Sequence, residues 1–432
     1  MPAGDLVEWL DEHGGPGFVW YVKRLSGNDT LANESHQAGP YIPRDFLFRI
    51  FPALARQEVK NPDIRFDLYV DSHADHREVR AIWYNNRFHG NPKGGRNETR
   101  LTGFGGSASA LLDPESTGAL TVFAFRVVDP PETADCHVWV CRHETEEDLV
   151  EDRVGPVEPG KWLLWPPAQG GLFPSAAPAA RTSCWLSDHE IPAAWRLKFP
   201  SGADIIRKAV ELRDDSSLDP DRRLLRRREC EFEIFRSVEQ AIELPHITAG
   251  FADIDSFIAR AQTILQRRKA RSGHSLELHA REIFLEERLV EGTHFAHQPV
   301  SEGGKTPDFL FPSIAAYRDM TFPADRLRML AVKTTCRDRW RQILNEADRI
   351  PAKHLLTLQE GVSETQFAEM TQAGVQLVVP AGLADKFPKA VQPHLQTLES
   401  FIGDVRLLPV AVAARNRMGS CSQTDHLSAR IS

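Results

Sequence analysis

Two short apolar runs, Pro307-Asp308-Phe309-Leu310-Phe311 and Met329-Leu330-Ala331-Val332-Lys333, stand out in the C-terminal half of the chain. Each has the length of a buried strand. A carboxylate opens the first run and a lysine closes the second, so the two charges meet at one rim if the strands pair as in a hairpin. A carboxylate there can hold Mg²⁺, which prefers oxygen ligands. The lysine can orient or deprotonate an attacking water, or stabilise charge on phosphorus. The pattern indicates metal-assisted hydrolysis of a phosphodiester.

Such a centre needs a second acid, and the position two before Lys333 holds Ala331. Helical periodicity over Asp338–Ile350 offers a substitute, because Glu346 lies on a face of that helix that can point back to the rim. Glu277, on an earlier predicted helix, is a further candidate. These residues alone leave a structural alternative open, in which the aspartate is a turn residue and the lysine a solvated strand end.

The two halves of the chain differ in the sequence patterns that predict secondary structure. Short apolar runs between Gly, Pro, Asn and Asp recur through the first 165 residues, which favours a barrel or sandwich. A stretch rich in Pro, Gly and Ala follows, with the composition of a linker, although a long surface loop stays an alternative. From residue 276 predicted helices and strands alternate, which is typical of an α/β domain with a mixed sheet. We expect a β-rich domain over 1–170, a linker over 171–200, an α/β domain over 201–414 and a flexible tail over 415–432. Helices before the mixed sheet are predicted at Ala203–Arg213, Arg222–Leu244, Phe251–Arg268 and Leu276–Val290.

Composition narrows the function classes. A chain of 432 residues holds two or three domains by its length. With 41% hydrophobic and 26% charged residues each domain can bury a core, which excludes wholesale disorder and a small disulfide scaffold. The 52 basic and 60 acidic residues give a formal charge of −8. Binding to phosphate must therefore come from local basic patches.

The six cysteines contain no C-x-x-C pair, which excludes the usual zinc-finger and redox motifs. Scattered free thiols suit a reducing cytoplasm. The N-terminus lacks the pattern of a signal peptide, and the longest apolar run, Leu407–Ala414, is too short to cross a membrane. We expect a soluble cytoplasmic protein with no membrane partner.

Two local patterns are set aside. Gly304-Lys305-Thr306 is like the end of a phosphate-binding loop, but Pro299 occupies the position of a required glycine and Pro307 blocks the helix that should follow. Tyr317 could attack a phosphodiester covalently, but no recombinase-like set of Arg and His surrounds it in sequence. A hydrogen-bonding or core role is favoured for it.

Longer runs carry a specific resemblance. The chain closely resembles the EcoRII-type (type IIE) restriction endonucleases over nearly its whole length, apart from the linker and the tail. The matching runs in the C-terminal half are Lys305–Pro312, Tyr317, Leu330–Ala347 and Thr357–Ser363. Those in the N-terminal half include Tyr21–Ser26, Asn28–Thr30, His36-Gln37 and Arg96–Glu98.

The resemblance implies a PD-(D/E)xK nuclease core with a mixed central sheet flanked by helices, and an N-terminal B3-like pseudobarrel as an effector domain. It implies a homodimer that cleaves double-stranded DNA at CCWGG with Mg²⁺. A second copy of the site, bound to the effector domain, would relieve that domain's obstruction of the catalytic cleft. A cognate cytosine methyltransferase would act on the same DNA site rather than bind this chain.

The resemblance also assigns roles to residues. Asp308, Lys333 and Glu346 fall on catalytic positions, with Asp308 and Glu346 as the metal ligands. Glu277 is a fourth candidate, and Tyr317 and Arg339 fall close to the catalytic centre.

Sequence readout is expected just after the catalytic lysine. Arg337 can bond bidentately to guanine and Asp338 can accept from cytosine N4, so the pair has the logic to read G·C steps. The alternative is a surface helix start, with an aspartate favoured by the helix dipole.

A basic run, Arg222–Arg228, offers phosphate contacts, or simply a solvated helix face. Arg228 and Phe232 are four apart on the same predicted helix face. A guanidinium and a ring so placed could sandwich a flipped base, and nucleases similar to this one extrude the central base pair of their site.

In the first domain Lys93, Arg96, Glu98 and Arg100 follow a predicted strand. Alternation places the last three on one side of an extended segment, and mixed charge there suits base edges better than phosphate alone. An exposed charged hairpin is the alternative. The resemblance adds Lys23 and His36 to the DNA-binding set of the effector domain.

Two rival functions remain open on the sequence. One is a non-cleaving, sequence-specific DNA-binding regulator on the same scaffold, against which the retained acidic and basic set argues. The other is a repair nuclease specific for DNA structure rather than sequence.

Overall fold

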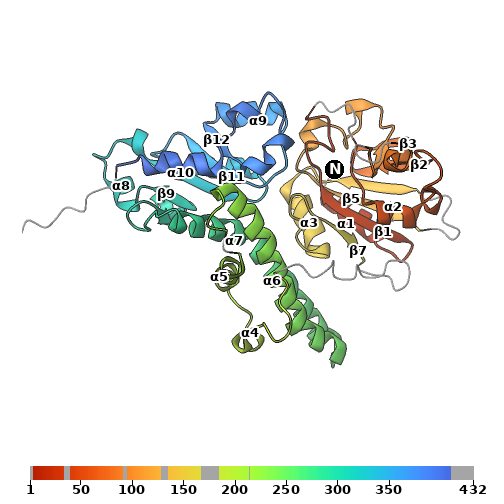
Figure 1. Cartoon of the computed structure of the whole chain (residues 1–432), viewed down its shortest axis with the longest axis horizontal. Helices are drawn as coiled ribbons and strands as arrows, with labels where there is room; N and C mark the ends of the chain where they lie inside the picture. The colour runs from red at the N-terminus through yellow and green to blue at the C-terminus, as the bar shows by residue number, and fades with distance from the viewer. Residues whose placement is uncertain are drawn as a thin grey trace, which may run out of the picture.

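The computed structural model describes residues 3–33, 39–90, 95–127, 135–166, 184–213 and 215–409. Two sheets form separate lobes, and long helices extend away from the lobe of the second sheet (Figure 1). Within the described residues, no helix is long and apolar enough to cross a membrane.

The N-terminal lobe is built on a seven-stranded sheet of order β4-β3-β2-β6-β5-β1-β7. Its neighbouring strands are antiparallel except for the parallel pair β2–β6. Separate apolar clusters pack on its two faces, which is why strand β5 is buried along almost its whole length. The strands are β1 (Phe18–Arg24), β2 (Asp63–Val70), β3 (Asp75–Tyr84), β4 (Glu98–Thr102), β5 (Leu120–Arg126), β6 (Cys136–Val140) and β7 (Trp162–Trp165), and the helices are α1 (Ala3–Glu12), α2 (Arg44–Ile50) and α3 (Glu144–Val154).

The C-terminal lobe is built on a five-stranded mixed sheet of order β12-β11-β10-β9-β8. Strands β10, β11 and β12 are parallel, whereas β8 and β9 pair antiparallel. The strands are β8 (Ala296–His297), β9 (Phe309–Phe311), β10 (Arg328–Lys333), β11 (Lys353–Thr357) and β12 (Val375–Val378). The helices of this half are α4 (Ala193–Leu197), α5 (Gly202–Leu212), α6 (Pro220–Ala249), α7 (Ile254–Glu286), α8 (Ile314–Arg318), α9 (Glu364–Gln372) and α10 (Leu398–Arg406).

Strand alternation divides the core of this lobe into two layers. Leu310, Met329 and Ala331 face a cluster that includes residues of α8 and α9. Phe309 and Leu330, one step along, face a cluster that includes residues of α6, α7 and α10. Successive side chains point to opposite faces of a strand, so the apolar runs are buried on both faces. The mixed α/β architecture and the β-rich N-terminal half predicted from the sequence are confirmed.

Three predictions of local structure were wrong. The helix predicted over Asp338–Ile350 is only a 3₁₀ helix over Arg339–Asn345. The two helices predicted between 251 and 290 form one continuous helix, α7. Cys184 and Cys230 form a disulfide instead of remaining free thiols. This bond joins residues 46 apart, so nothing local in the sequence indicates it.

The basic run on α6 is largely buried in ion pairs rather than solvated. Arg223 and Arg227 approach Glu286 on α7 at 2.9 and 2.7 Å. Further along the two helices, Arg268 of α7 pairs with Glu239 of α6 at 2.6 Å. These charges bind α6 to α7. The domain limits predicted at residues 170, 200 and 414 stay predictions.

Candidate active site and its contacts with the N-terminal lobe

Asp308 and Lys333 meet at one end of the β9–β10 pair. The antiparallel register sets Phe309 against Leu330, so Asp308, directly before β9, faces the end of β10. Its Oδ2 accepts a 2.7 Å hydrogen bond from the Val332 amide, and Lys333 Nζ lies 3.9 Å from the same atom. Burial raises the pKa of Asp308, and the lysine opposes that shift. The sequence-based hypothesis that these two charges share a rim is therefore geometrically satisfied.

Glu346 reaches the same place without the predicted helix. The 3₁₀ helix stops at Asn345 and Glu346 is extended, because Ala347 takes a left-handed conformation with φ of 48°. Lys353 Nζ donates to the main-chain carbonyls of Glu346 and Ala347, which holds the turn. Burial and the negative charge of Asp308 raise the pKa of the Glu346 side chain to about 7. The negative charge of Asp308 therefore acts on the Glu346 carboxyl group.

Glu277 approaches from α7 and adds a third carboxylate. It is buried, and its negative charge contributes to the raised pKa of Asp308. Its Oε1 lies 2.6 Å from Nε2 of His297 on β8. The His297 ring stacks on Phe309 at 5.1 Å, which fixes its plane. Sequence reasoning missed His297, and a lone histidine in a two-residue strand gives no signal that would have found it.

The donor set fits a hard divalent cation. The charge of Asp308 raises the pKa of Glu346, and the charge of Glu277 raises the pKa of Asp308, so the three carboxyl groups form an acidic cluster that a cation would stabilise. Mg²⁺ takes oxygen ligands and is usually held by one or two carboxylates plus water and phosphate oxygens. Asp308 and Glu346 are the residues that could hold such an ion.

Tyr317 lies on α8 and is engaged elsewhere. Its hydroxyl donates to both carboxylate oxygens of Glu302, at 2.7 and 2.8 Å. Burial and this hydrogen bond raise its pKa to about 12. The contacts of Tyr317 support a hydrogen-bonding role beside the rim rather than a nucleophilic one.

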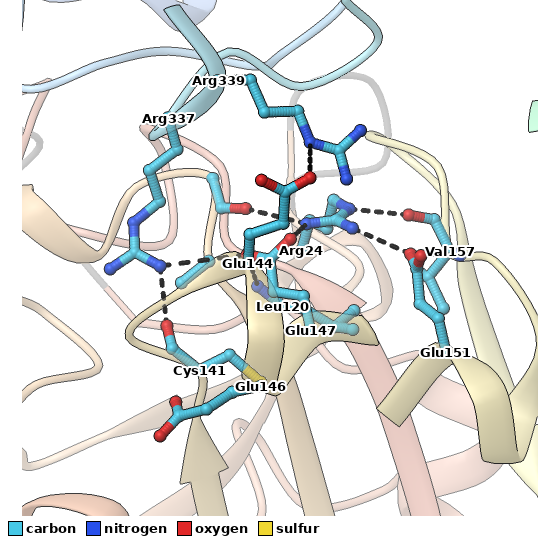
Figure 2. Close-up of polar contacts among 12 residues, drawn as sticks. Arg24, Leu120, Cys141, Glu144, Glu146, Glu147, Glu151, Val157, Arg337 and Arg339 are labelled. Carbon is cyan, nitrogen blue, oxygen red and sulfur yellow. Dashed lines mark hydrogen bonds and ion pairs between the residues drawn. The ribbon is translucent and has the colours of Figure 1, made fainter. Parts of the chain in front are cut away.

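Two arginines that follow β10 contact the N-terminal lobe at or near helix α3: Arg337, which was expected to read DNA, and Arg339, which was expected near the catalytic centre (Figure 2). Arg337 Nη1 donates to the carbonyl of Cys141 at 2.7 Å and lies 3.9 Å from Glu147 Oε1. Arg339 Nε lies 3.0 Å from Glu144 Oε1, and Gln342 donates to the other oxygen of Glu144 at 3.0 Å. Asp338 is less constrained, with Arg341 4.0 Å away.

A buried arginine on strand β1 holds helix α3 through two ion pairs. Arg24 on β1 lies 2.6 Å from Glu147 and 2.8 Å from Glu151, and its Nε donates to the carbonyl of Val157 at 2.7 Å (Figure 2). Glu147 therefore stands between an arginine of its own lobe and Arg337 of the other. The acidic first turn of α3 therefore faces the C-terminal lobe, where Glu144 and Glu147 lie beside arginines.

Arg228 is paired with the N-terminal lobe, whereas Phe232 stays exposed. Glu158 lies 3.0 Å from Arg228 and 2.8 Å from Arg271, whose guanidinium sits 4.8 Å above the Phe232 ring. Burial alone would raise the pKa of Glu158, but the two arginines outweigh it and hold the pKa below its ordinary value. The Glu158 carboxylate thus holds Arg228 and also the arginine that covers the Phe232 ring.

Two of the DNA-binding candidates of the N-terminal lobe, Arg100 and Lys23, lie near Gly39, whereas Arg96 lies over a ring of β3. Arg100 donates to the carbonyl of Gly39 at 3.2 Å and lies 3.6 Å from Glu98, while Arg96 sits 5.6 Å above the Tyr84 ring. Lys23 on β1 pairs at 2.6 Å with Asp29, whose carbonyl accepts the Gly39 amide. Lys93 and His36 lie outside the described residues.

Comparisons with known proteins identify the family of both halves of the chain. Residues 14–169 match the family described as restriction endonuclease EcoRII, N-terminal, and residues 235–402 match the family described as EcoRII C terminal. The type II restriction enzyme EcoRII of Escherichia coli is 45% identical over 403 residues, which is 92% of this chain and 96% of that protein.

Two solved structures are more distant. Metal-depleted Ecl18kI in complex with uncleaved, modified DNA is 17% identical with a TM-score of 0.41, covering 49% of this chain and 80% of that one. The B3 domain of the UbaLAI restriction endonuclease with cognate DNA is 17% identical with a TM-score of 0.26, covering 37% of this chain and 96% of that one.

Proposed function

Because this chain belongs to the EcoRII family of type II restriction endonucleases, and is therefore a site-specific enzyme that cleaves DNA, we propose that Asp308, Lys333 and Glu346 perform its hydrolysis. The proposal is supported by the 3.9 Å approach of Lys333 to Asp308 at one end of the β9–β10 pair, where both charges also act on the Glu346 carboxyl group. Restriction endonucleases generally need a divalent metal, and we propose Mg²⁺ at Asp308 and Glu346.

The chain's own groups divide the work. When bound, Mg²⁺ would supply a Lewis acid that polarises the phosphate and lowers the pKa of water. The Val332 amide fixes the orientation of Asp308. Lys333, whose side chain is 26% exposed, can reach a phosphate oxygen and stabilise the charge that develops there. Glu277, oriented by His297, is positioned to order water beside Asp308.

Metal affinity should rise with pH through the neutral range. Glu346 binds a cation only when ionised, and its pKa of about 7 in the metal-free protein means that protons compete below that value. We expect Mn²⁺ or Mg²⁺ affinity, measured by calorimetry on the full chain, to be roughly 10-fold higher at pH 8 than at pH 6. Glu346→Gln should weaken binding and flatten this dependence. A metal affinity that stays the same between pH 6 and pH 8 would contradict the role of Glu346.

For recognition we propose CCWGG, with Arg337 and Asp338 reading G·C steps and Arg228 with Phe232 receiving an extruded base. Readout of both strands would need two copies of the chain, so we propose a homodimer. A cognate cytosine methyltransferase would protect the site by modifying DNA, with no contact to this chain.

We further propose that the N-terminal lobe restrains cleavage until it binds a second DNA site. The proposal is supported by the contacts of Glu144, Glu147 and Glu158 with arginines that would otherwise face DNA. Carboxylates in these positions compete with phosphate and base edges for the same guanidinium groups.

Digestion of DNA of known sequence tests the assignment most directly. With Mg²⁺ we expect discrete fragments whose mapped ends all fall at CCWGG, and no cutting when the inner cytosines carry methyl groups. Intact DNA would favour a non-cleaving regulator, and random ends would favour a nuclease that recognises DNA structure.

A further inference from the structure

Three side chains from distant parts of the N-terminal lobe converge at one point far in sequence from the nuclease residues. His13 directly follows α1, Asp71 opens the turn after β2, and His137 lies on β6. One potential ligand atom from each lies within 4.8 Å of the others. We propose that His13, Asp71 and His137 form a binding site for a transition-metal ion such as Zn²⁺. The proposal is independent of the cleavage mechanism.

His13 is arranged as a metal-binding histidine would be. Its side chain is buried, and Nδ1 lies 3.0 Å from the main-chain carbonyl of Trp9, to which it can donate. That contact leaves Nε2 without a proton and free to bind a metal. Zinc-binding histidines almost always donate their other ring nitrogen to a carbonyl or carboxylate in this way. The Trp9 ring stacks on the His13 ring at 4.7 Å and fixes its plane.

Asp71 supplies the negative charge. Its Oδ2 accepts hydrogen bonds from Trp9 Nε1 at 2.6 Å and from His137 Nδ1 at 2.9 Å. Within the described part of the chain, no such bond involves Oδ1. The Asp71 side chain is 27% exposed, so an ion and a water can reach it from solvent. The carboxylate is thus oriented by one oxygen while the other remains available.

His137 is held between aromatic neighbours. Its ring centre lies 4.4 Å from that of His13 and 4.9 Å from that of Tyr69, which stacks in turn on His76. Two imidazoles this close cannot both be protonated without repulsion. Nitrogen ligands from two histidines and a carboxylate oxygen thus face a common position that a divalent cation could fill.

The donor set points to a four-coordinate ion. Two histidines and one carboxylate with a water are ligands that Zn²⁺ takes in open tetrahedral sites. Bonds of about 2.0 Å place tetrahedral ligand atoms about 3.3 Å apart, so a pair of ligand atoms at the 4.8 Å limit would approach by about 1.5 Å on binding an ion. Such an ion would tie the end of α1 to the sheet.

Cobalt absorption tests the site in the full chain. The protein is stripped with a chelator, saturated with Mg²⁺ to fill oxygen-rich sites, and titrated with Co²⁺. We expect one equivalent of strongly absorbing tetrahedral Co²⁺, displaced by Zn²⁺, and a rise in melting temperature with Zn²⁺ concentration. His13→Gln, Asp71→Asn and His137→Asn should each lose the signal and bind Zn²⁺ roughly 100-fold more weakly.

The matched control is His76→Gln, which alters an exposed histidine beside the cluster and should keep the full signal. Absence of tetrahedral Co²⁺ in the unaltered protein overturns the proposal without any variant, and the cluster is then only a hydrogen-bond network. Equal loss in His76→Gln also overturns it, because the ion would then sit elsewhere.

Discussion

Asp308→Ala and Lys333→Ala should each slow DNA cleavage by about 10³-fold or more while leaving specific DNA binding within a few-fold. In the proposed mechanism Asp308 would hold the metal and Lys333 would stabilise the charge that develops on the phosphate, so both would act mainly in the transition state. Neither belongs to the proposed reading set. Single-turnover cleavage in Mg²⁺ measures the first effect, and binding to a cognate duplex without Mg²⁺ measures the second.

Two exposed residues of the same types serve as controls. Asp325 lies before the opposite end of β10, and Lys389 lies between β12 and α10. Asp325→Ala and Lys389→Ala should cut at the normal rate. Parallel loss of binding and cutting in the Asp308 and Lys333 variants would show that these residues support the structure instead of the chemistry.

Weakening the contact between the lobes should accelerate cleavage of DNA that carries a single site. A fragment lacking residues 1 to about 180 should cut such DNA at least about 10-fold faster than the full chain, and Glu158→Gln in the full chain should give part of that gain. Removing one member of a buried ion-pair network leaves uncompensated charge, which favours separation of Arg228 and Arg271 from the other lobe. Initial cleavage rates on one-site and two-site plasmids measure the effect.

A glycine provides an independent way to open the same interface. The Gly27 amide donates to the Glu360 carbonyl at 2.7 Å, and a Cβ at Gly27 would meet the carbonyl of Lys386 at 2.3 Å. Gly27→Ala should therefore wedge the lobes apart and raise single-site cleavage. Gly17→Ala, where a Cβ meets nothing within 4 Å, and Glu58→Gln on the exposed surface should change nothing. Unchanged or slower single-site cutting in the fragment and in the interface variants would remove the restraint from the scheme.

The sequence predicted the strands of the active site because their information is local. Asp308 begins one apolar run and Lys333 ends the other, so the two runs predict both the strands and the edge of the sheet where the charges meet. The element carrying Glu346 could not be predicted, since the left-handed turn at Ala347 depends on Lys353 reaching over from β11. Helix propensity within residues 338–350 cannot predict that contact, because Lys353 lies outside this segment.

Contacts between the lobes were equally beyond sequence reasoning. Glu144 and Glu158 read as ordinary acidic surface residues, and their meaning comes from arginines about 200 and 70 residues away in the chain. Arg228 was predicted to face DNA, and the structure places it in an ion pair that only the assembled fold creates. The whole-chain resemblance implied a restraint by the N-terminal lobe, but the contacts proposed to carry it could not be predicted from the sequence.

Helix α7 runs unbroken from Ile254 to Glu286. Near the middle of α7, Arg271 forms an ion pair with Glu158 of the other lobe. Six residues later, Glu277 lies close enough to Asp308 for its charge to raise the pKa of Asp308. At 1.5 Å per residue the two points are about 9 Å apart on one stiff rod. If the lobes separate as proposed, any tilt of α7 would also move Glu277, so this helix would couple docking of the N-terminal lobe to the proposed catalytic site.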